Sequence, residues 1–318
     1  MRVSAGAPHT RLLGLGDYRP TRVVTNLELA GRLDTSDGWI RSRTGISSRR
    51  IAGPGESVVA MAAAAAGKAI AESGLAPADV DLLVLATCTM ATPIPGGAPQ
   101  VAHLLGVNGI AAFDINAACG GFCYALSVAA DAVRGGSARH AVVIGSERMS
   151  DWVDWEDRST AILFGDGAAA AVVGPAEQPG IGPVAWGSDG GRAGLIGVPA
   201  DGRFLQMDGQ PVYRWATSAL APVARQACEL AGIAPGDLSA IVPHQANLRV
   251  IEALARALDA PRAVVARDIV EAGNTSAASV PLALCRLLAD GQLPAGSLAL
   301  LLAFGAGLSY AGQVVRVP

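Results

Sequence analysis

The feature of this sequence that most constrains its fold is an internal repeat. The segment ESGLAPADVDLLV at residues 72–84 is similar to LAGIAPGDLSAIV at residues 230–242. A second pair follows in the same order, FGDGAAAAVV from Phe164 and FGAGLSYAGQ from Phe304. A Gly-Leu/Ile-Ala-Pro-x-Asp connection between a helix and a strand also recurs by chance, but two matches in one order favour a duplication. We therefore predict two similar halves, residues 1–175 and 176–318, packed against each other.

The pattern of apolar residues predicts the fold class. Short apolar runs that are typical of buried strands alternate with longer segments of helical periodicity. The clearest strands are expected at residues 81–87, 111–116, 141–146, 239–242 and 297–304. This alternation predicts an α/β fold with mostly parallel strands. Pockets form preferentially where two such halves meet, so we expect the functional site between them.

Composition and charge exclude several classes of protein. Charged residues make up only 16% of the chain, the net charge is −3 and the basic residues are scattered, so we expect no nucleic-acid partner. The five cysteines are an odd number spread along the chain, unlike the disulfide framework of a small secreted protein. No apolar run approaches the roughly 20 residues that cross a bilayer, and no signal peptide is visible. We therefore expect a cytoplasmic protein without a membrane partner.

Cys119 is the candidate nucleophile. It lies in DINAACGGF, residues 114–122, which runs from a predicted strand through a tight turn into a helix. The free N–H groups and the positive dipole end of that helix favour the thiolate, so we expect a lowered pKa for Cys119. Two alternatives remain from the residues alone, a small buried side chain or a metal pair with Cys123. The metal pair is disfavoured, because no cluster of histidine or cysteine elsewhere supplies further ligands.

Two polar residues follow strands in the second half. His244 comes directly after a predicted strand and before a helix expected over Leu248–Leu258. Asn274 lies in a turn, and Thr275 or Ser276 is expected to cap the next helix. Taken singly, the histidine also fits an ordinary loop residue and the asparagine an ordinary turn residue. The Asn-Thr-Ser run also matches a glycosylation acceptor, which has no relevance in the cytoplasm.

Together, these three residues and their surroundings resemble the ketoacyl synthase III family, condensing enzymes of the thiolase superfamily. The resemblance covers essentially the whole chain and rests on ordered motifs: TSDGWIRSRTGISSRR (35–50), AACGGF (117–122), DR (157–158) leading to FGDG (164–167), PHQANLR (243–249), GNTSAAS (273–279) and FGAG (304–307). Each motif alone is weak, but their order and spacing are highly specific. The resemblance implies an α/β, thiolase-like fold in which two duplicated βαβαβαββ halves form a five-layered α-β-α-β-α arrangement.

The same resemblance implies a decarboxylative Claisen condensation. Cys119 would take an acyl group from acyl-coenzyme A, and the carbanion formed when malonyl-acyl-carrier protein loses CO₂ would attack the acyl-enzyme. His244 Nε2 and the Asn274 amide would be the neutral donors that stabilise the enolate. The backbone N–H groups of Cys119 and Ala306 would form the oxyanion hole. Many relatives have glycine in place of Ala306, and the backbone donor is kept where alanine adopts the φ and ψ of the loop. No cofactor is implied, because the coenzyme A thioester is a substrate.

The resemblance also assigns the surfaces that meet substrates and partners. The expected coenzyme A residues are Trp39, Arg43, Arg158 and Asn247, and the expected docking residues for the acidic carrier protein are Arg214, Arg249 and Arg256. Met90 and Ile94 are expected at the acyl pocket, in a loop with which the partner subunit of relatives closes that pocket, so a homodimer is expected. Ile94 is smaller than the aromatic residue of some relatives, which favours longer or branched primers. From the residues alone, Trp39 also fits a half-buried helix anchor, and Glu252 fits a neutralising partner of Arg249.

Three other functions are considered. A superfamily acyltransferase would move the acyl group to a hydroxyl or an amine without condensation. A papain-like hydrolase also uses Cys, His and Asn, but the duplication and the FGDG and FGAG loops have no place in that fold. A silent partner subunit that sets chain length typically lacks the nucleophile, whereas all three residues are present here.

Overall fold

The computed structural model describes residues 5–318 and contains two five-stranded sheets. The first has the order β1-β7-β6-β4-β5 and consists of β1 (His9–Tyr18), β4 (Leu82–Ala86), β5 (Ala111–Ile115), β6 (Ala141–Arg148) and β7 (Asp166–Ala176). The second has the order β12-β11-β13-β14-β8 and consists of β8 (Ala185–Gly187), β11 (Ala240–Pro243), β12 (Val264–Val265), β13 (Leu298–Phe304) and β14 (Tyr310–Arg316). The two orders coincide when strands are matched in chain order, with β1 corresponding to β8 and β7 to β14. The predicted duplication of the fold is confirmed, and the boundary after residue 175 stays a prediction.

Each sheet is mixed rather than mostly parallel. β4 is parallel to both of its neighbours, and so is β11. β7 and β14 run antiparallel to both of theirs. The expectation of mostly parallel strands is therefore wrong for the strand pairs that include β7 or β14. In the second half the reason is local, because β13 joins β14 through the short loop 305–309, which cannot hold a crossover helix.

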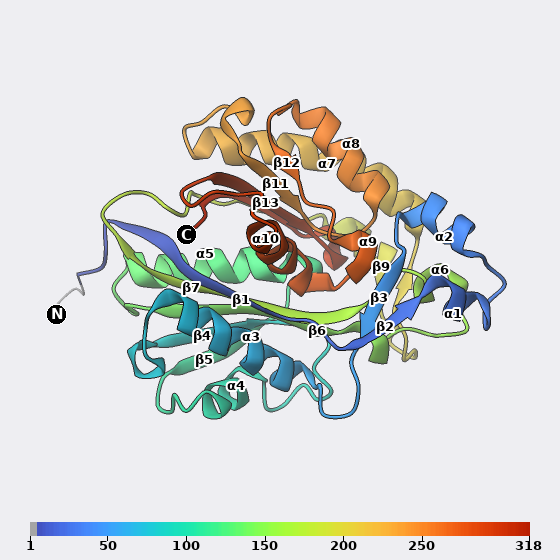
Figure 1. Cartoon of the computed structure of the whole chain (residues 1–318), viewed down its shortest axis with the longest axis horizontal. Helices are drawn as coiled ribbons and strands as arrows, with labels where there is room; N and C mark the ends of the chain where they lie inside the picture. The colour runs from blue at the N-terminus through green and yellow to red at the C-terminus, as the bar shows by residue number, and fades with distance from the viewer. Residues whose placement is uncertain (1–4) are drawn as a thin grey trace.

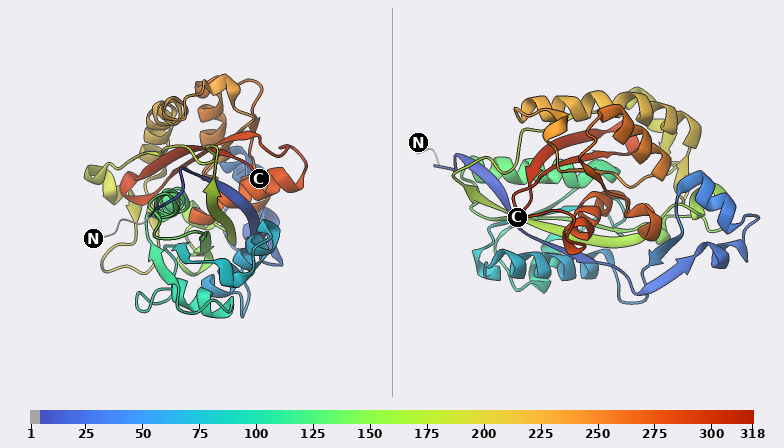
Figure 2. Two further views of the ribbon diagram at one scale, coloured as in Figure 1. Left: turned by 90° about the vertical axis from the view of Figure 1, so that its left-hand side faces the viewer. Right: turned by 45° about the horizontal axis from the view of Figure 1, so that its top comes forward.

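The helices lie in three layers around the two sheets (Figure 1). α5 (Gly121–Arg134) and α10 (Ser279–Ala289) lie between the sheets; α3 (Val58–Ser73) and α4 (Ala98–Leu104) cover the outer face of the first sheet; α7 (Gly209–Leu230) and α8 (Leu248–Leu258) cover the outer face of the second. Figure 2 shows the same succession of layers from two further directions. The predicted α-β-α-β-α fold and the predicted bounds of the Leu248–Leu258 helix are confirmed.

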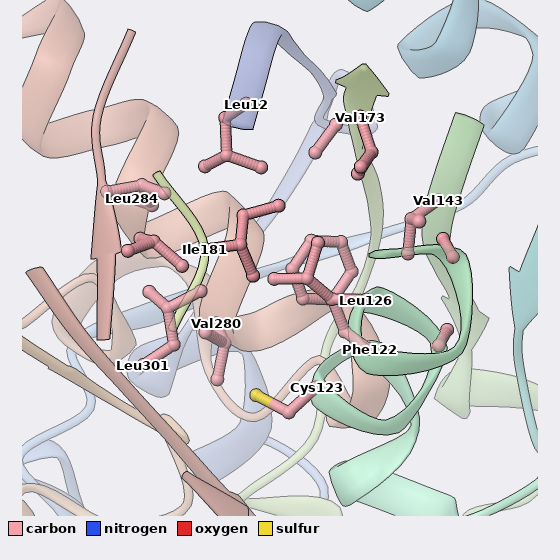
Figure 3. Packing of buried hydrophobic residues seen from close by; sticks show 14 of the residues in the cluster. Leu12, Phe122, Cys123, Leu126, Val143, Val173, Ile181, Val280, Leu284 and Leu301 are labelled. Carbon is pink, nitrogen blue, oxygen red and sulfur yellow. The ribbon is translucent and has the colours of Figure 1, made fainter. Parts of the chain in front are cut away.

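Apolar contacts between α5, α10 and the inner faces of both sheets hold the central layer. Phe122 and Leu126 of α5 lie in one buried cluster with Val280 and Leu284 of α10 (Figure 3). Burying an apolar side chain of this size contributes about 1.5–3 kcal/mol to the stability of the folded state. Because α5 is buried against both sheets, the residues at its start are fixed relative to both halves.

The repeated sequence forms the same turn in each half. Gly74 and Gly232 follow α3 and α7 with φ values of 74° and 71°, in the left-handed region that favours glycine. Two residues later, a backbone N–H donates at 2.9 Å to Asp79 Oδ2 in the first half and to Asp237 Oδ2 in the second. The sequence match therefore reflects one local structure used twice.

The smaller elements are β2 (Arg22–Thr25), β3 (Ser48–Ile51), β9 (Ile196–Gly197), β10 (Gln206–Met207), α1 (Asn26–Ala30), α2 (Asp37–Thr44), α6 (Arg158–Ala161) and α9 (Ile269–Ala272). β2 pairs with β3, and β9 with β10. In Figure 1, α1, α2 and α6 gather at one end of the molecule. Within residues 5–318, no helix combines the length and the apolar character needed to cross a bilayer.

Candidate active site

Cys119 sits where β5 gives way to α5. The chain leaves β5 at Ile115, makes a 3₁₀ turn over Ala118–Gly120 and enters α5 at Gly121, which is the predicted strand-turn-helix junction. The loop after β13 packs against this turn, because a Cβ placed on Gly305 would lie 2.6 Å from Cys119 N. A glycine is therefore required where the two loops, one from each half, approach each other.

The expected lowering of the Cys119 pKa is wrong. Burial raises the pKa of the Cys119 thiol to about 12; a hydrogen bond with Ser276 lowers the pKa, and the Glu147 carboxylate raises it. A backbone hydrogen bond at Cys119 also lowers the pKa, but the loss of hydration around a thiolate outweighs it. Cys119 is therefore a thiol at neutral pH, and its proton must be removed before the sulfur can attack a thioester.

His244 is buried directly after β11. Its Nδ1 lies 2.6 Å from the Ser279 hydroxyl, which also accepts from the N–H of Gln245. We assign the Ser279 hydrogen to the bond with Nδ1, so that the hydroxyl uses its donor as well as one of its acceptor sites, and the ring proton then lies on Nε2. Burial lowers the pKa of His244 to about 3, so the ring is neutral. The surroundings thus favour the neutral Nε2–H donor that the chemistry requires.

The buried neutral His244 makes stability depend on pH. In the unfolded chain the histidine has a pKa near 6.5, so between that value and the folded value of about 3 the unfolded state binds the extra proton. Stability attributable to His244 is present above pH ~6.5 and falls by about 1.4 kcal/mol per pH unit below it. On going from pH 7 to pH 5, the parent should lose about 2 kcal/mol more unfolding free energy than His244→Gln, measured by urea denaturation. Equal losses in both proteins would contradict this assignment.

Asn274 is fixed by contacts of its backbone and of its side chain. Its backbone N–H donates to the carbonyl of Leu163, and its carbonyl accepts from the N–H of Gly165. Its side-chain Oδ1 accepts from the N–H of Ser276 at 2.9 Å. This bond sets the orientation of the amide and leaves its NH₂ group as a donor at the cavity that the residue lines.

Neither Thr275 nor Ser276 caps the next helix, so that expectation is wrong. The N-cap of α10 is Ala278, and a 3₁₀ turn over Ser276–Ala278 comes first. The Ser276 hydroxyl donates instead to Glu147 Oε1 at 2.9 Å. A bond to a carboxylate is stronger than one to a neutral acceptor, which explains why this arrangement replaces the cap.

One cavity of about 340 Å³ joins the three candidate residues. Cys119, His244 and Asn274 all line it, although they come from different halves of the chain. Its apolar wall includes Met149, Trp152, Phe164, Ile196, Val198, Leu205, Met207, Val212 and Phe304. Nothing in the sequence predicts that these residues form a pocket wall. The lining suits an acyl chain that ends in a reactive thioester carbonyl at the sulfur.

The predicted oxyanion hole is compatible with the alanine in its second loop. Cys119 and Ala306 both border the cavity. Ala306 begins the 3₁₀ turn Ala306–Leu308 without a positive φ, which occurs instead at Gly307 (73°) and Leu308 (42°). Alanine at this position therefore brings no backbone strain, and the departure from the family pattern leaves the N–H donor in place.

The predicted coenzyme A residues form a surface cluster outside the cavity lining. The guanidinium carbon of Arg158 lies 4.9 Å from the centroid of the Trp39 ring, and that of Arg43 lies 5.7 Å away. Both arginines are exposed, whereas Trp39 is half-buried against an apolar cluster. The tryptophan is thus both a helix anchor and a partner of two cations.

Asn247 acts as a cap and a link between helices. Its Oδ1 accepts from the N–H of Arg249 at the start of α8, and its Nδ2 donates to the carbonyl of Arg43 at 3.0 Å. These bonds hold the C-terminal end of α2 beside α8. Its expected contact with the pantetheine arm stays a prediction.

The three predicted docking residues are exposed on α7 and α8: Arg214, Arg249 and Arg256. The alternative in which Glu252 neutralises Arg249 is wrong, because Glu252 pairs with Arg267 at 2.7 Å. The Arg249 guanidinium lies over the ring of Tyr213. Within residues 5–318, none of the three docking arginines forms an ion pair, so their charges are available to an acidic partner.

Met90 and Ile94 do not line the cavity of their own chain, and their expected place at the acyl pocket stays a prediction. The Ile94 side chain is 85% exposed. The loop that carries both residues extends from the first sheet, and its apolar tip has no cover among residues 5–318. The expected closure of an acyl pocket by this loop of a partner subunit stays a prediction.

A duplicated thiolase-like fold with a thiol, a neutral histidine and an amide donor around one apolar cavity defines a condensing enzyme that works through a covalent acyl intermediate. Comparison with known proteins gives the family. The chain matches the 3-oxoacyl-[acyl-carrier-protein (ACP)] synthase III family over residues 113–190 and the C-terminal domain of the same family over residues 228–317. The chain belongs to this family.

Relatives and solved structures agree with this assignment. Beta-ketoacyl-[acyl-carrier-protein] synthase III 4 of Streptomyces coelicolor is 56% identical over 315 residues, covering 97% of this chain and 99% of that protein. The priming beta-ketosynthase from the R1128 polyketide biosynthetic pathway is 48% identical, with a TM-score of 0.97 and coverage of 100% and 98%. The Aquifex aeolicus 3-oxoacyl-[acyl-carrier-protein] synthase III is 41% identical, with a TM-score of 0.93 and coverage of 96% and 99%. Condensation is therefore the reaction of this chain, and simple acyl transfer to a hydroxyl or an amine is not favoured.

Proposed function

We propose that both half-reactions of the condensation of an acyl-coenzyme A primer with malonyl-acyl-carrier protein take place in this cavity. Cys119 is the acyl acceptor, which makes the protein an acyltransferase in its first half-reaction. The observation that carries the proposal is the convergence of Cys119, neutral His244 and the Asn274 amide on one apolar cavity. Two neutral donors stabilise the malonyl enolate without supplying a proton that would quench it.

The first substrate is recognised outside the cavity. We assign the adenine end of coenzyme A to Trp39 with Arg43 and Arg158, because a planar guanidinium stacks on an aromatic ring and also carries charge toward phosphate. Asn247 supports this cluster from α8. The coenzyme A thioester is consumed as a substrate, so the proposal needs no cofactor. All five cysteines are free thiols, which supports a reducing, cytoplasmic location.

We propose that the chain forms a homodimer through the edge of the first sheet. β5 is its edge strand, and Phe113 on that strand is 41% exposed. An exposed apolar edge is a template for pairing with a second chain. Met90 and Ile94 then belong to a loop that reaches the acyl pocket of the partner, where the aliphatic Ile94 leaves room for a longer or branched primer.

Mass spectrometry of the intact protein tests the proposal. The protein is mixed with acetyl-, butyryl- or isobutyryl-coenzyme A, and the mass added at Cys119 is followed in time. We expect one acyl group per chain, with the four-carbon and branched primers at least as fast as acetyl. Addition of malonyl-carrier protein should then discharge the acyl group and release CO₂. No acyl adduct from any primer would overturn the proposed first half-reaction, and strong preference for acetyl would overturn the primer assignment alone.

Charge reversal at the docking surface should affect only the carrier-protein substrate. Arg249→Glu is expected to raise KM for malonyl-carrier protein about tenfold, and to leave the rate of acylation by acyl-coenzyme A unchanged. Arg139→Glu makes the same change of charge on an exposed loop before β6 and serves as the control. Steady-state kinetics at low and moderate salt measure the effect, which should shrink as salt increases. Equal effects of the two substitutions would contradict the docking assignment.

A further inference from the structure

Glu147 is a buried carboxylate that the reaction described so far does not use. It lies on β6 with no solvent exposure. Its Oε2 accepts from the hydroxyls of Thr87 and Thr89 and from the N–H of Cys88. Its Oε1 accepts from the Ser276 hydroxyl at 2.9 Å. All of these partners are donors, so the network is built around an ionised carboxylate.

No positive charge balances this carboxylate. Within residues 5–318, Glu147 has no arginine, lysine or histidine in an ion pair. The titratable groups that face it are the thiols of Cys88 and Cys119. Burial raises the pKa of Glu147, while its hydrogen bonds lower it. A buried carboxylate of this kind is a better proton acceptor than an exposed one.

Ser276 connects the carboxylate to the nucleophile. Its hydroxyl donates to Glu147 Oε1, the turn that carries it packs against the turn that carries Cys119, and hydrogen bonding by Ser276 lowers the pKa of the Cys119 thiol. Ser276 and Cys119 line the same cavity, whereas Glu147 lies behind them, outside its lining. A hydroxyl that donates to one group and accepts from another can pass a proton between them.

The histidine of the site is a poor alternative as the base. Burial lowers the pKa of His244 to about 3, and its Nδ1 is occupied by Ser279. The Glu147 carboxylate also raises the pKa of Cys119, so a thiolate and a carboxylate are not both stable in this space. Removal of the Cys119 proton is therefore easier when Glu147 takes up a proton at the same time.

We propose that Glu147 accepts the proton of Cys119 through the Ser276 hydroxyl during acyl capture, stores it while the acyl-enzyme exists, and returns it when the condensation ends. Glu147 acts through Ser276 and does not touch the substrate. This assignment deepens the proposed function, on which it rests.

The proton and electron balance of the cycle closes with this assignment. As the sulfur of Cys119 attacks the primer thioester, its proton moves to Ser276 Oγ while the Ser276 proton moves to Glu147 Oε1. The C–S bond to coenzyme A breaks, and the coenzyme A thiolate takes a proton from water. In the second half-reaction, the enolate left by loss of CO₂ attacks the acyl carbon and the Cys119 thiolate leaves. That thiolate recovers the stored proton through Ser276, which restores the Glu147 carboxylate.

The test is the pH dependence of acyl capture in single-turnover experiments. Glu147→Gln keeps the size of the side chain but removes the base, so acylation by acyl-coenzyme A should fall at least about 100-fold at pH 7. In this variant the rate should rise about tenfold per pH unit, because hydroxide must remove the proton, while the parent shows a shallower profile. Ser276→Ala should behave in the same way. Ser146→Ala is the matched control, because Ser146 precedes Glu147 on β6 but donates to the carbonyl of Val58, outside the carboxylate network, so the rate and the pH profile should stay near those of the parent.

A second measurement separates proton transfer from a structural role. Glu147 also holds the loop that carries Asn274, so a merely structural defect would impair decarboxylation of malonyl-carrier protein. CO₂ release is therefore compared between Cys119→Ala and Cys119→Ala/Glu147→Gln, neither of which can form the acyl-enzyme, and should be equal within a factor of about two. A parallel loss of decarboxylation, or a Glu147→Gln protein with the parental acylation rate and pH profile, would overturn the proposal. Failure of the proposed function itself would appear in the parent protein, as no acylation at all.

Discussion

Replacing Cys119 with alanine should abolish the acyl-enzyme and lower the rate of condensation by at least about 10⁴-fold. The cavity offers one other thiol, Cys88, but burial and the Glu147 carboxylate raise its pKa well above the usual value. Cys119→Ser should also be severely impaired, because a hydroxyl is far harder to deprotonate than a thiol in the same buried place. The measurement is the intact mass of the protein after exposure to acyl-coenzyme A, together with product formation.

Cys123 provides the matched control for this prediction. It lies four residues further along, fully buried within α5 and outside the cavity lining. Cys123→Ala should therefore keep acylation and condensation near the parental rates. Acylation of the Cys119→Ala protein at the parental rate would show that another residue accepts the acyl group, and the assignment of the nucleophile would be wrong.

The candidate nucleophile and its candidate partners could be selected from the sequence because each lies at a local junction. A strand, a tight turn with glycines and a helix place Cys119, and the end of a buried strand places His244. These signals depend on residues that are neighbours in the chain. The internal repeat also indicates which elements of the first half correspond to which elements of the second half. The predicted five-layered fold is confirmed for the same reason, since the two halves share one strand order.

The properties that were missed depend on residues distant in the chain. The pKa of Cys119 is set by burial and by Glu147 from β6, and neither is visible in the AACGGF motif. Ser279 lies within the GNTSAAS motif, but its bond to His244 joins α10 to the end of β11. The available signal for Glu147 was a carboxylate within the buried strand Ala141–Arg148. A buried charge in such a strand requires partners, and in this protein those partners are the segment Thr87–Thr89 after β4 and Ser276 in the loop that follows Asn274.

Loss of the two neutral donors should separate the half-reactions. His244→Ala and Asn274→Ala are each expected to lower decarboxylation and condensation about 10²–10³-fold, the usual cost of one oxyanion donor. Acyl capture does not need these donors, so the acyl-enzyme should form and then accumulate. Ser279→Ala should give a smaller loss of about tenfold, because it releases the ring without removing it.

The accumulation of acyl-enzyme is the decisive observation for these variants. Intact mass after mixing with acyl-coenzyme A and malonyl-carrier protein should show the acylated form persisting in His244→Ala and Asn274→Ala, and discharged in the parent. Because both donors bind the same enolate oxygen, the double variant should lose less than the product of the single effects. If either single variant failed to become acylated, its residue would belong to acyl capture, and the division of labour between the thiol and the two donors would have to be redrawn.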